Sequence, residues 1–235
     1  MREAPLRGQY ARAMNGIILP RHRRWLTIHG LFSPSDARVW MAFAFVAALT
    51  AATCAVAIAG ANERGIDDAL LLTGRVSFIM FWLAYAGRSA ARLFGQRFEP
   101  LKRQSRNFGL AFASAHVVHL GLVAWLCYIG ASPPFSSFVT FGIAVFWTYL
   151  LAIVSIGRLQ KAVGQRQWRL ISFVGLNYIA IAFAFDFMRL HPDMSLKYLV
   201  GYLPFVVLAV AGFALRGCAC VASLVQVSGS GKLNR

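Results

Sequence analysis

Long apolar runs separated by short polar connections dominate the pattern of this chain from residue 39 onward. A helix needs about 20 apolar residues to cross the ~30 Å hydrocarbon core of a bilayer. Six runs meet this requirement: 39–61, 70–87, 107–130, 135–157, 170–190 and 198–222. The runs are continuously apolar, which favours helices over strands that alternate between two faces. The pattern therefore predicts an all-α, polytopic membrane protein folded as a six-transmembrane-helix bundle.

The polar segments divide the chain into a basic leader at 1–38, a membrane domain at 39–222 and a tail at 223–235. The leader has no small-residue cleavage site placed for the first run, so we expect that run to remain as an uncleaved anchor. A transporter often has paired helices broken by Gly or Pro near the bilayer centre. Here only Pro204, in the sixth run, is expected to interrupt a helix, which disfavours small-solute transport.

Composition supports the membrane interpretation, because 58% of the residues are hydrophobic and only 14% are charged. An average soluble domain has roughly 25% charged residues. The net charge of +16 is unevenly placed: nineteen of the 24 cations lie in the leader, the second-to-third and fourth-to-fifth connections and the tail. This bias predicts that both termini lie in the cytoplasm of a bacterial inner membrane. No nucleic-acid-binding module is present, so we expect a lipid bilayer and no nucleic acid as partner.

The third run, within "RNFGLAFASAHVVHLGLVAWL" at 106–126, contains His116 and His119. At about 1.5 Å per residue from Asn107, His119 is expected roughly 18 Å deep, near the bilayer centre. An imidazole at that depth needs a polar partner. Two interpretations remain open on spacing alone. His119 could be an axial ligand of haem b, or the pair could form interhelical hydrogen bonds.

Four motifs bear on this choice: Thr73-Gly74-Arg75, "RSAARLFGQRFEPLKRQSRN", "RNFGLAFASAHVVH" and "GQRQWRLISFVGLNYIAIAFAF". Together they make roughly residues 70–190 resemble the ferric-reductase-like transmembrane family, whose members include six-helix haem-b proteins. The resemblance implies that His119 takes the third-helix position of a haem ligand and binds the haem iron.

The fifth run departs from that family, which also places ligand histidines there. The corresponding neighbourhoods read Ile171-Ser172 and Phe185-Asp186, and the run has no histidine. His116 lies on the same helix as His119 and cannot reach the opposite face of a haem. Tyr178 and Met188 are poor replacements. We therefore expect at most one haem b, held by His119 with His116 beside it.

Two charges inside the predicted helices, Arg75 and Asp186, fall in the outer third of the bilayer. A structural ion pair between them would satisfy both, with Arg189 as a competing partner for Asp186. A proton or quinone site is the functional alternative.

These expectations combine into an integral membrane electron-transfer subunit, a possible oxidoreductase component without its own flavin domain. Its electrons would come from a flavoprotein or a quinol, docked on the basic connections. The alternatives are a haem-free relative that acts as a membrane anchor or assembly partner and, less favoured, a small-solute transporter.

Overall fold

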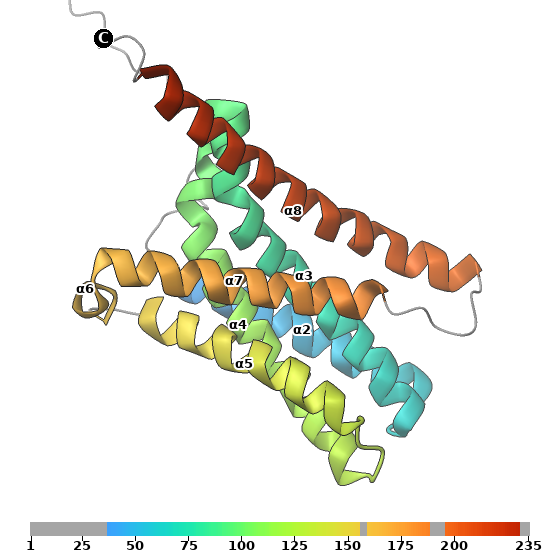
Figure 1. Ribbon diagram of the computed structural model, residues 1–235. Coiled ribbons are helices and arrows are strands. Elements are labelled where there is room, and N and C mark those ends of the chain that lie inside the picture. The colour runs from blue at the N-terminus through green and yellow to red at the C-terminus, as the bar shows by residue number, and fades with distance from the viewer. Residues whose placement is uncertain (1–36, 156–158, 189–195, 231–235) are drawn as a thin grey trace, which may run out of the picture. The chain divides into compact units, whose positions relative to one another are not determined.

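The computed structural model describes residues 37–155, 159–188 and 196–230, which all lie in the unit Pro34–Arg235. The described part is entirely helical (Figure 1). Its elements are α2 (Ala37–Ala59), α3 (Glu63–Phe94), η3 (Gly95–Phe98), α4 (Glu99–Tyr128), α5 (Phe135–Ser155), α6 (Leu159–Val163), α7 (Gln165–Met188) and α8 (Leu196–Ser230). The predicted leader at 1–38 lies almost wholly outside the described residues.

Five helical stretches among the described residues are long and apolar enough to cross a membrane: Ala37–Ala59, Glu63–Tyr128, Phe135–Ser155, Gln165–Met188 and Gly201–Val225. Many of their large apolar side chains are exposed, such as Ile58 at 88% and Val221 at 60%. Exposed apolar patches of this extent suit contact with lipid. The helices indicate a multi-pass membrane protein.

The second stretch has 66 residues because it contains α3, η3 and α4. The two long helices are joined by η3, where Gly95 has a φ of 73°. Glycine adopts this left-handed conformation without steric strain, so the chain can turn here. Pro100 then lies in the first turn of α4, a position that tolerates its missing N–H. The segment therefore doubles back on itself.

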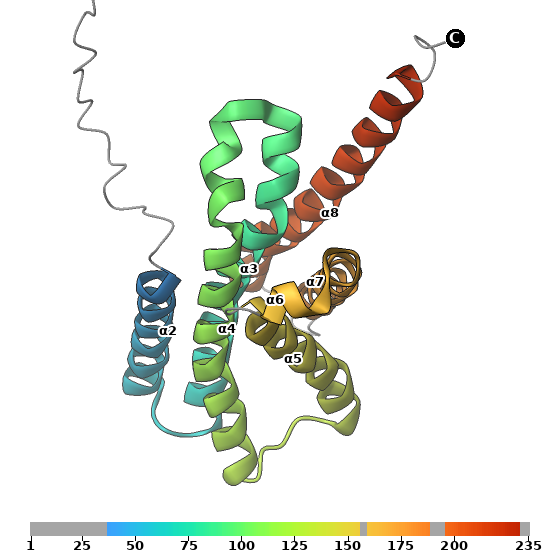
Figure 2. The same cartoon turned by 90° about the vertical axis from the view of Figure 1, so that its left-hand side faces the viewer.

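Three contacts show that α3 and α4 run antiparallel along their lengths (Figure 2). Thr73 meets His119, Phe81 meets Phe112, and a Cβ on Gly87 would lie 2.9 Å from the Ser105 hydroxyl. Glycine at position 87 thus permits the close approach of the two arms.

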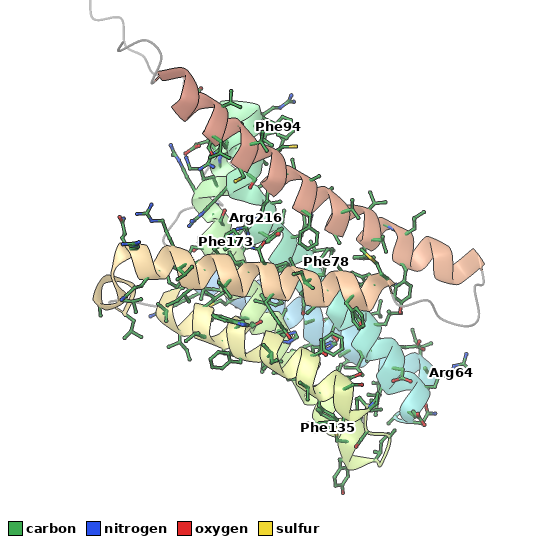
Figure 3. All side chains as sticks on the ribbon, in the orientation of Figure 1. Arg64, Phe78, Phe94, Phe135, Phe173 and Arg216 are labelled. Atoms are coloured by element: carbon green, nitrogen blue, oxygen red, sulfur yellow. The ribbon has the colours of Figure 1, made fainter. Side chains whose placement is uncertain are left out.

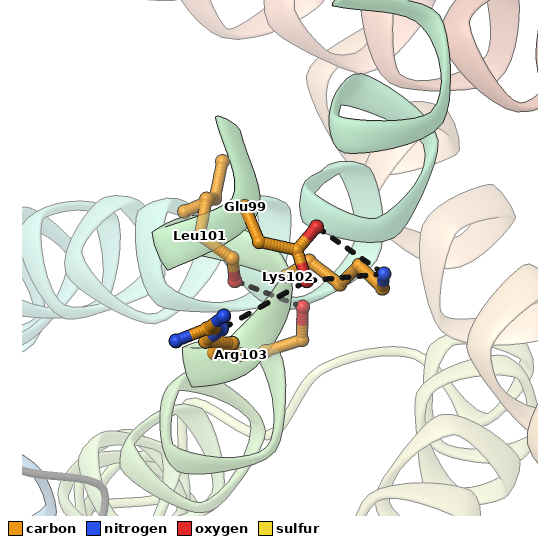
Figure 4. A network of polar contacts seen from close by, with 5 residues as sticks. Glu99, Leu101, Lys102 and Arg103 are labelled. Carbon is orange, nitrogen blue, oxygen red and sulfur yellow. Dashed lines mark hydrogen bonds and ion pairs between the residues drawn. The ribbon is translucent and has the colours of Figure 1, made fainter. Parts of the chain in front are cut away.

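Beside the turn, Glu99 binds Lys102 at 3.2 Å and Arg103 at 3.8 Å, and the Ser105 hydroxyl donates to the Leu101 carbonyl at 3.1 Å (Figure 4). These contacts lie within the first turns of α4. The predicted basic connection is therefore largely helical, with only the short η3 turn between the arms.

An alanine seam joins α2 to α4. Ala44 and Ala48 pack against Ala111 and Ala115, and all four are fully buried. Small residues four apart let two helix backbones approach closely inside a membrane. The Ser114 hydroxyl donates to a backbone carbonyl of α2, that of Met41, at 3.0 Å.

A second seam joins α3 to α8, and these two helices run parallel. Arg75 donates to the Gly201 carbonyl at 3.0 Å, and Trp82 donates to the Leu208 carbonyl at 2.6 Å. Both pairs are separated by 126 residues, so the register is constant over two turns. Helix α8 continues through Pro204, which corrects the expected interruption.

The main core is an aromatic cluster where α3, α4, α7 and α8 meet. Its rings include Phe78, Phe81, Phe112, Phe183, Phe187 and Phe205. Phe78 lies 5.2 Å from Phe183 and 4.8 Å from Phe187 between ring centroids (Figure 3). Such edge-to-face pairs stabilise a core beyond the area that they bury.

Candidate functional site

His119 lies on α4 and faces α3, where its Nδ1 atom is 3.0 Å from the Thr73 hydroxyl. Thr73 is fully buried, and the adjacent Gly74 leaves the His119 ring room against α3. A Cβ on Gly74 would come within 3.7 Å of the ring. The sequence prediction that this imidazole finds a polar partner is therefore met by a residue of the neighbouring helix.

The hydrogen-bond partners of Thr73 favour one direction for its bond with His119. The Thr73 hydroxyl lies 2.8 Å from the Ala69 carbonyl and 3.2 Å from that of Leu70, both of which can only accept. Since a hydroxyl has a single proton, Thr73 donates to its own helix and its oxygen accepts from His119. This direction assigns His119 the neutral tautomer with its proton on Nδ1 and its lone pair on Nε2. This is the arrangement found where a histidine binds a metal through Nε2.

His116 lies one turn away on the same helix. Its ring is stacked on that of His119, with 5.2 Å between centroids and 13° between planes. Imidazole lone pairs lie in the ring plane, so two stacked, nearly parallel rings do not converge on one ion. The structure therefore places His116 and His119 side by side, but not in an arrangement in which both rings bind the same metal ion.

The buried Nδ1 atom of His116 has no hydrogen-bond partner among the described residues. Its ring is flanked by His119 on one side and by Phe112, with 5.5 Å between centroids, on the other. A buried imidazole nitrogen without a partner is unfavourable. This atom is the unsatisfied polar group of the histidine pair.

The donor set allows one protein ligand to a haem iron. His119 offers Nε2, whereas α7 supplies no histidine, and Tyr178 donates its hydroxyl to the Thr140 carbonyl at 3.1 Å. Met188 is half exposed at the end of α7. Within the described ranges, no group of three or more His, Cys, Asp or Glu side chains is arranged to hold a metal ion.

The aromatic cluster limits where a porphyrin could lie. Phe112, one turn from His116, contacts Phe183 of α7 at 5.9 Å between centroids. These rings occupy the contact between α4 and α7 at that level. A flat group cannot lie there without displacing them.

Arg75 is directed toward α8. Its guanidinium binds the Gly201 carbonyl and lies 5.5 Å from the ring centroid of Tyr202 and 5.3 Å from that of Phe205. A cation over aromatic faces is stabilised where water is scarce. Arg189, the competing partner expected for Asp186, lies outside the described residues, and the pairing of Arg75 with Asp186 stays a prediction.

One polar network in the helices was missed by the sequence analysis. The Tyr85 hydroxyl lies 2.9 Å from Asn177 Oδ1, and Asn177 Nδ2 donates to the Phe173 carbonyl at 2.7 Å. Arg216 of α8 lies above the Tyr85 ring, 4.4 Å from its centroid. The sequence did contain a sign of this network, because Asn177 and Arg216 stand in otherwise apolar runs. A polar or charged residue inside a transmembrane segment indicates a functional site or a paired group.

Comparison with known proteins adds no family assignment: no protein-family model, no characterised protein and no solved structure matches this chain.

Proposed function

We propose that the protein crosses the membrane six times, with both termini on the cytoplasmic side of a bacterial inner membrane. The stretch Glu63–Tyr128 would be about 99 Å long as one straight helix, far more than the ~30 Å core. Its two arms instead pack antiparallel, so each arm is a crossing of its own. The parallel seam of α3 and α8 agrees with this count, because the second and sixth crossings of such a chain point the same way. The cation bias supplies the orientation.

We further propose a membrane electron-transfer subunit that resembles ferric-reductase-like haem-b proteins, with at most one haem b on His119. The observation that carries this proposal is the hydrogen bond to Thr73, which leaves Nε2 as the free lone pair. Haem b would supply reversible one-electron transfer. Thr73 and Gly74 orient the imidazole, and the surrounding apolar helices keep water away from it.

The electron donor in this proposal is a flavoprotein or a quinol. The turn between α3 and α4 offers a basic face, where Arg88, Arg92 and Arg97 are exposed. Complementary charge steers such partners toward one another. Arg106, by contrast, binds the Ser155 carbonyl through Nη2 at 2.6 Å and so satisfies the end of α5.

A second candidate is a haem-free membrane anchor or assembly partner. The aromatic cluster favours it, because Phe112 and Phe183 fill the contact between α4 and α7 that a haem bridging these helices would need. In this case the bond from His119 to Thr73 would be purely a helix–helix contact.

A reduced-minus-oxidised absorption spectrum of the purified protein distinguishes the two candidates. The protein should be produced in haem-replete cells, together with the variants His119→Ala and His116→Ala. We expect a b-type signal in the wild type, its loss in His119→Ala, and its retention in His116→Ala with an altered band position. A folded wild-type protein without a Soret band would reject the haem and leave the anchor.

A further inference from the structure

Arg216 carries a charge into the contact between α3, α7 and α8. Its guanidinium lies 4.4 Å from the ring centroid of Tyr85 and 5.7 Å from that of Phe173 (Figure 3). In the described part of the chain, no carboxylate lies within ion-pair distance of Arg216. The aromatic faces hold the cation in place but do not neutralise it.

The seam between α3 and α8 fixes the position of this side chain. Gly212 lies one turn before Arg216, and a Cβ there would be 3.1 Å from Trp82 Nε1 and 3.4 Å from Tyr85 Cδ1. The bond from Trp82 to the Leu208 carbonyl sets the same register one turn earlier. These contacts place the α8 backbone at Arg216, and the Tyr85 and Phe173 rings orient its guanidinium, which lowers the entropy lost on binding.

Among the described residues, the hydrogen bonds around Tyr85 use only one donor of Arg216. Asn177 Nδ2 donates to the Phe173 carbonyl, so Asn177 Oδ1 is directed at Tyr85 and accepts its proton. The Tyr85 oxygen can then accept a bond from Arg216. A guanidinium has five N–H donors in its plane, and a single acceptor occupies only one of them.

A second cation adds to the unneutralised charge. Arg88 follows Tyr85 by three residues on α3, so it lies one turn away on the same face as the ring that Arg216 covers, and the two positive charges repel each other. It follows directly after the apolar run 70–87, so it marks the predicted boundary between hydrocarbon and headgroups on the basic side. Two arginine side chains one turn apart at that depth favour an anion between them.

We propose that Arg216 and Arg88 bind a phosphate group, supplied by the headgroup of an anionic phospholipid. A planar guanidinium forms paired, charge-assisted hydrogen bonds with phosphate oxygens. The exposed ring of Phe173, 61% accessible, lies beside the site and suits contact with an acyl chain. This inference rests on the proposed membrane crossing and is independent of the haem.

The test measures binding of phosphatidylglycerol to the detergent-purified full chain by native mass spectrometry and by its effect on the thermal unfolding midpoint. Phosphatidylcholine and inorganic phosphate are the comparison ligands. The variants are Arg216→Gln, Arg88→Gln and Arg97→Gln. Arg97→Gln is the control, because it also removes one positive charge, and Arg97 is an exposed residue of η3 outside the proposed site. Removing one charged partner of such a bond should weaken binding roughly ten- to a hundredfold.

We expect phosphatidylglycerol to bind and to raise the midpoint in the wild type and in Arg97→Gln, with both effects reduced in Arg216→Gln and Arg88→Gln. An equal response to inorganic phosphate would support the phosphate site with a free anion as its source. The proposal is overturned if neither phosphate source binds, or if Arg97→Gln weakens binding as much as Arg88→Gln, which would indicate general attraction to a basic surface. Arg88→Gln keeps the test valid if Arg216→Gln fails to fold, because Arg88 is exposed.

Discussion

At the scale of single residues, polar side chains inside the bundle use backbone carbonyls of neighbouring helices as acceptors. Trp82 donates to Leu208, Tyr178 to Thr140, and Arg75 to Gly201. A carbonyl already used in a helix has a second lone pair, so such bonds need no extra polar side chain. They give polar groups a partner where lipid offers none, although the buried Nε of Arg75 has no partner among the described residues.

Thr73 and His119, like Tyr85 and Asn177, are two side chains that bind each other across helices, and this pair provides the first prediction. Thr73→Val keeps the shape but removes the hydroxyl, so His119 loses its acceptor. We expect the free energy of unfolding to fall by about 0.5–1.5 kcal/mol. Thr73→Ser keeps the hydroxyl and should retain most of the stability. Thermal or denaturant unfolding in detergent measures both.

The Thr73 pair also has a spectroscopic consequence if haem is present. Without the bond, the His119 ring can rotate and the b-type band should shift or broaden in Thr73→Val, but not in Thr73→Ser. Equal stability and equal spectra for both variants would show that the hydroxyl does not position His119.

The sequence predicted that His119 needs a partner but not which residue supplies it. The depth of His119 in the bilayer follows from counting residues along one helix, whereas its hydrogen-bond partner depends on the register between α3 and α4. That register is set by contacts such as Gly87 with Ser105 and Phe81 with Phe112, which no single run reveals. The same limit applies to Arg75, whose observed contact lies 126 residues away on α8.

At the scale of helices, glycine and alanine determine which pairs approach closely. A Cβ on Gly175 of α7 would lie 2.8 Å from Trp147 and 3.0 Å from Leu151 of α5. Gly142 of α5 has nothing within 4 Å of its Cβ position. The two glycines thus form a natural pair of test sites, one at a helix contact and one in open space.

Gly175→Leu should separate α5 from α7 and lower the free energy of unfolding by about 1–3 kcal/mol through overpacking. Gly142→Leu should leave stability unchanged or raise it, because leucine is the better helix former and meets no neighbour. Unfolding midpoints of the two purified variants provide the measurement. If both variants lose stability equally, the contact between α5 and α7 is not the close one described.

Helix lengths were predicted less well than helix existence. Hydropathy placed the second run at 70–87, but α3 extends from Glu63 to Phe94. Hydropathy identifies the residues that suit lipid. A helix, however, extends as far as its backbone hydrogen bonds continue and ends where a capping residue stops them. Here Asn62 caps the start by accepting from the Gly65 N–H at 3.1 Å, and the positive φ of Gly95 ends the helix.

At the scale of the whole molecule, the six-crossing proposal requires the ends of α4 to lie on opposite sides of the membrane. Gln96 in η3 and Ser132 after α4 are both exposed, which makes them suitable for labelling. The four native cysteines, Cys54, Cys127, Cys218 and Cys220, would first be replaced by alanine.

In that background, Gln96→Cys should react with a membrane-impermeant thiol reagent only from the cytoplasmic side, and Ser132→Cys only from the other. Labelling of intact cells compared with inverted vesicles distinguishes the sides. Reaction of both from the same side would mean that α4 does not cross, and the count would fall to five or fewer.

The seam between α3 and α8 also bears on how the chain is made. Because α8 follows α3 in the sequence, the carbonyl acceptors of Arg75 and Trp82 are synthesised 126 residues after these side chains. During that interval, the Arg75 guanidinium needs another polar environment, such as the translocation channel or a membrane chaperone. A polypeptide stalled before residue 201 would therefore hold the Arg75 guanidinium without its carbonyl acceptor, which is a physical difference between a partial product and a finished one.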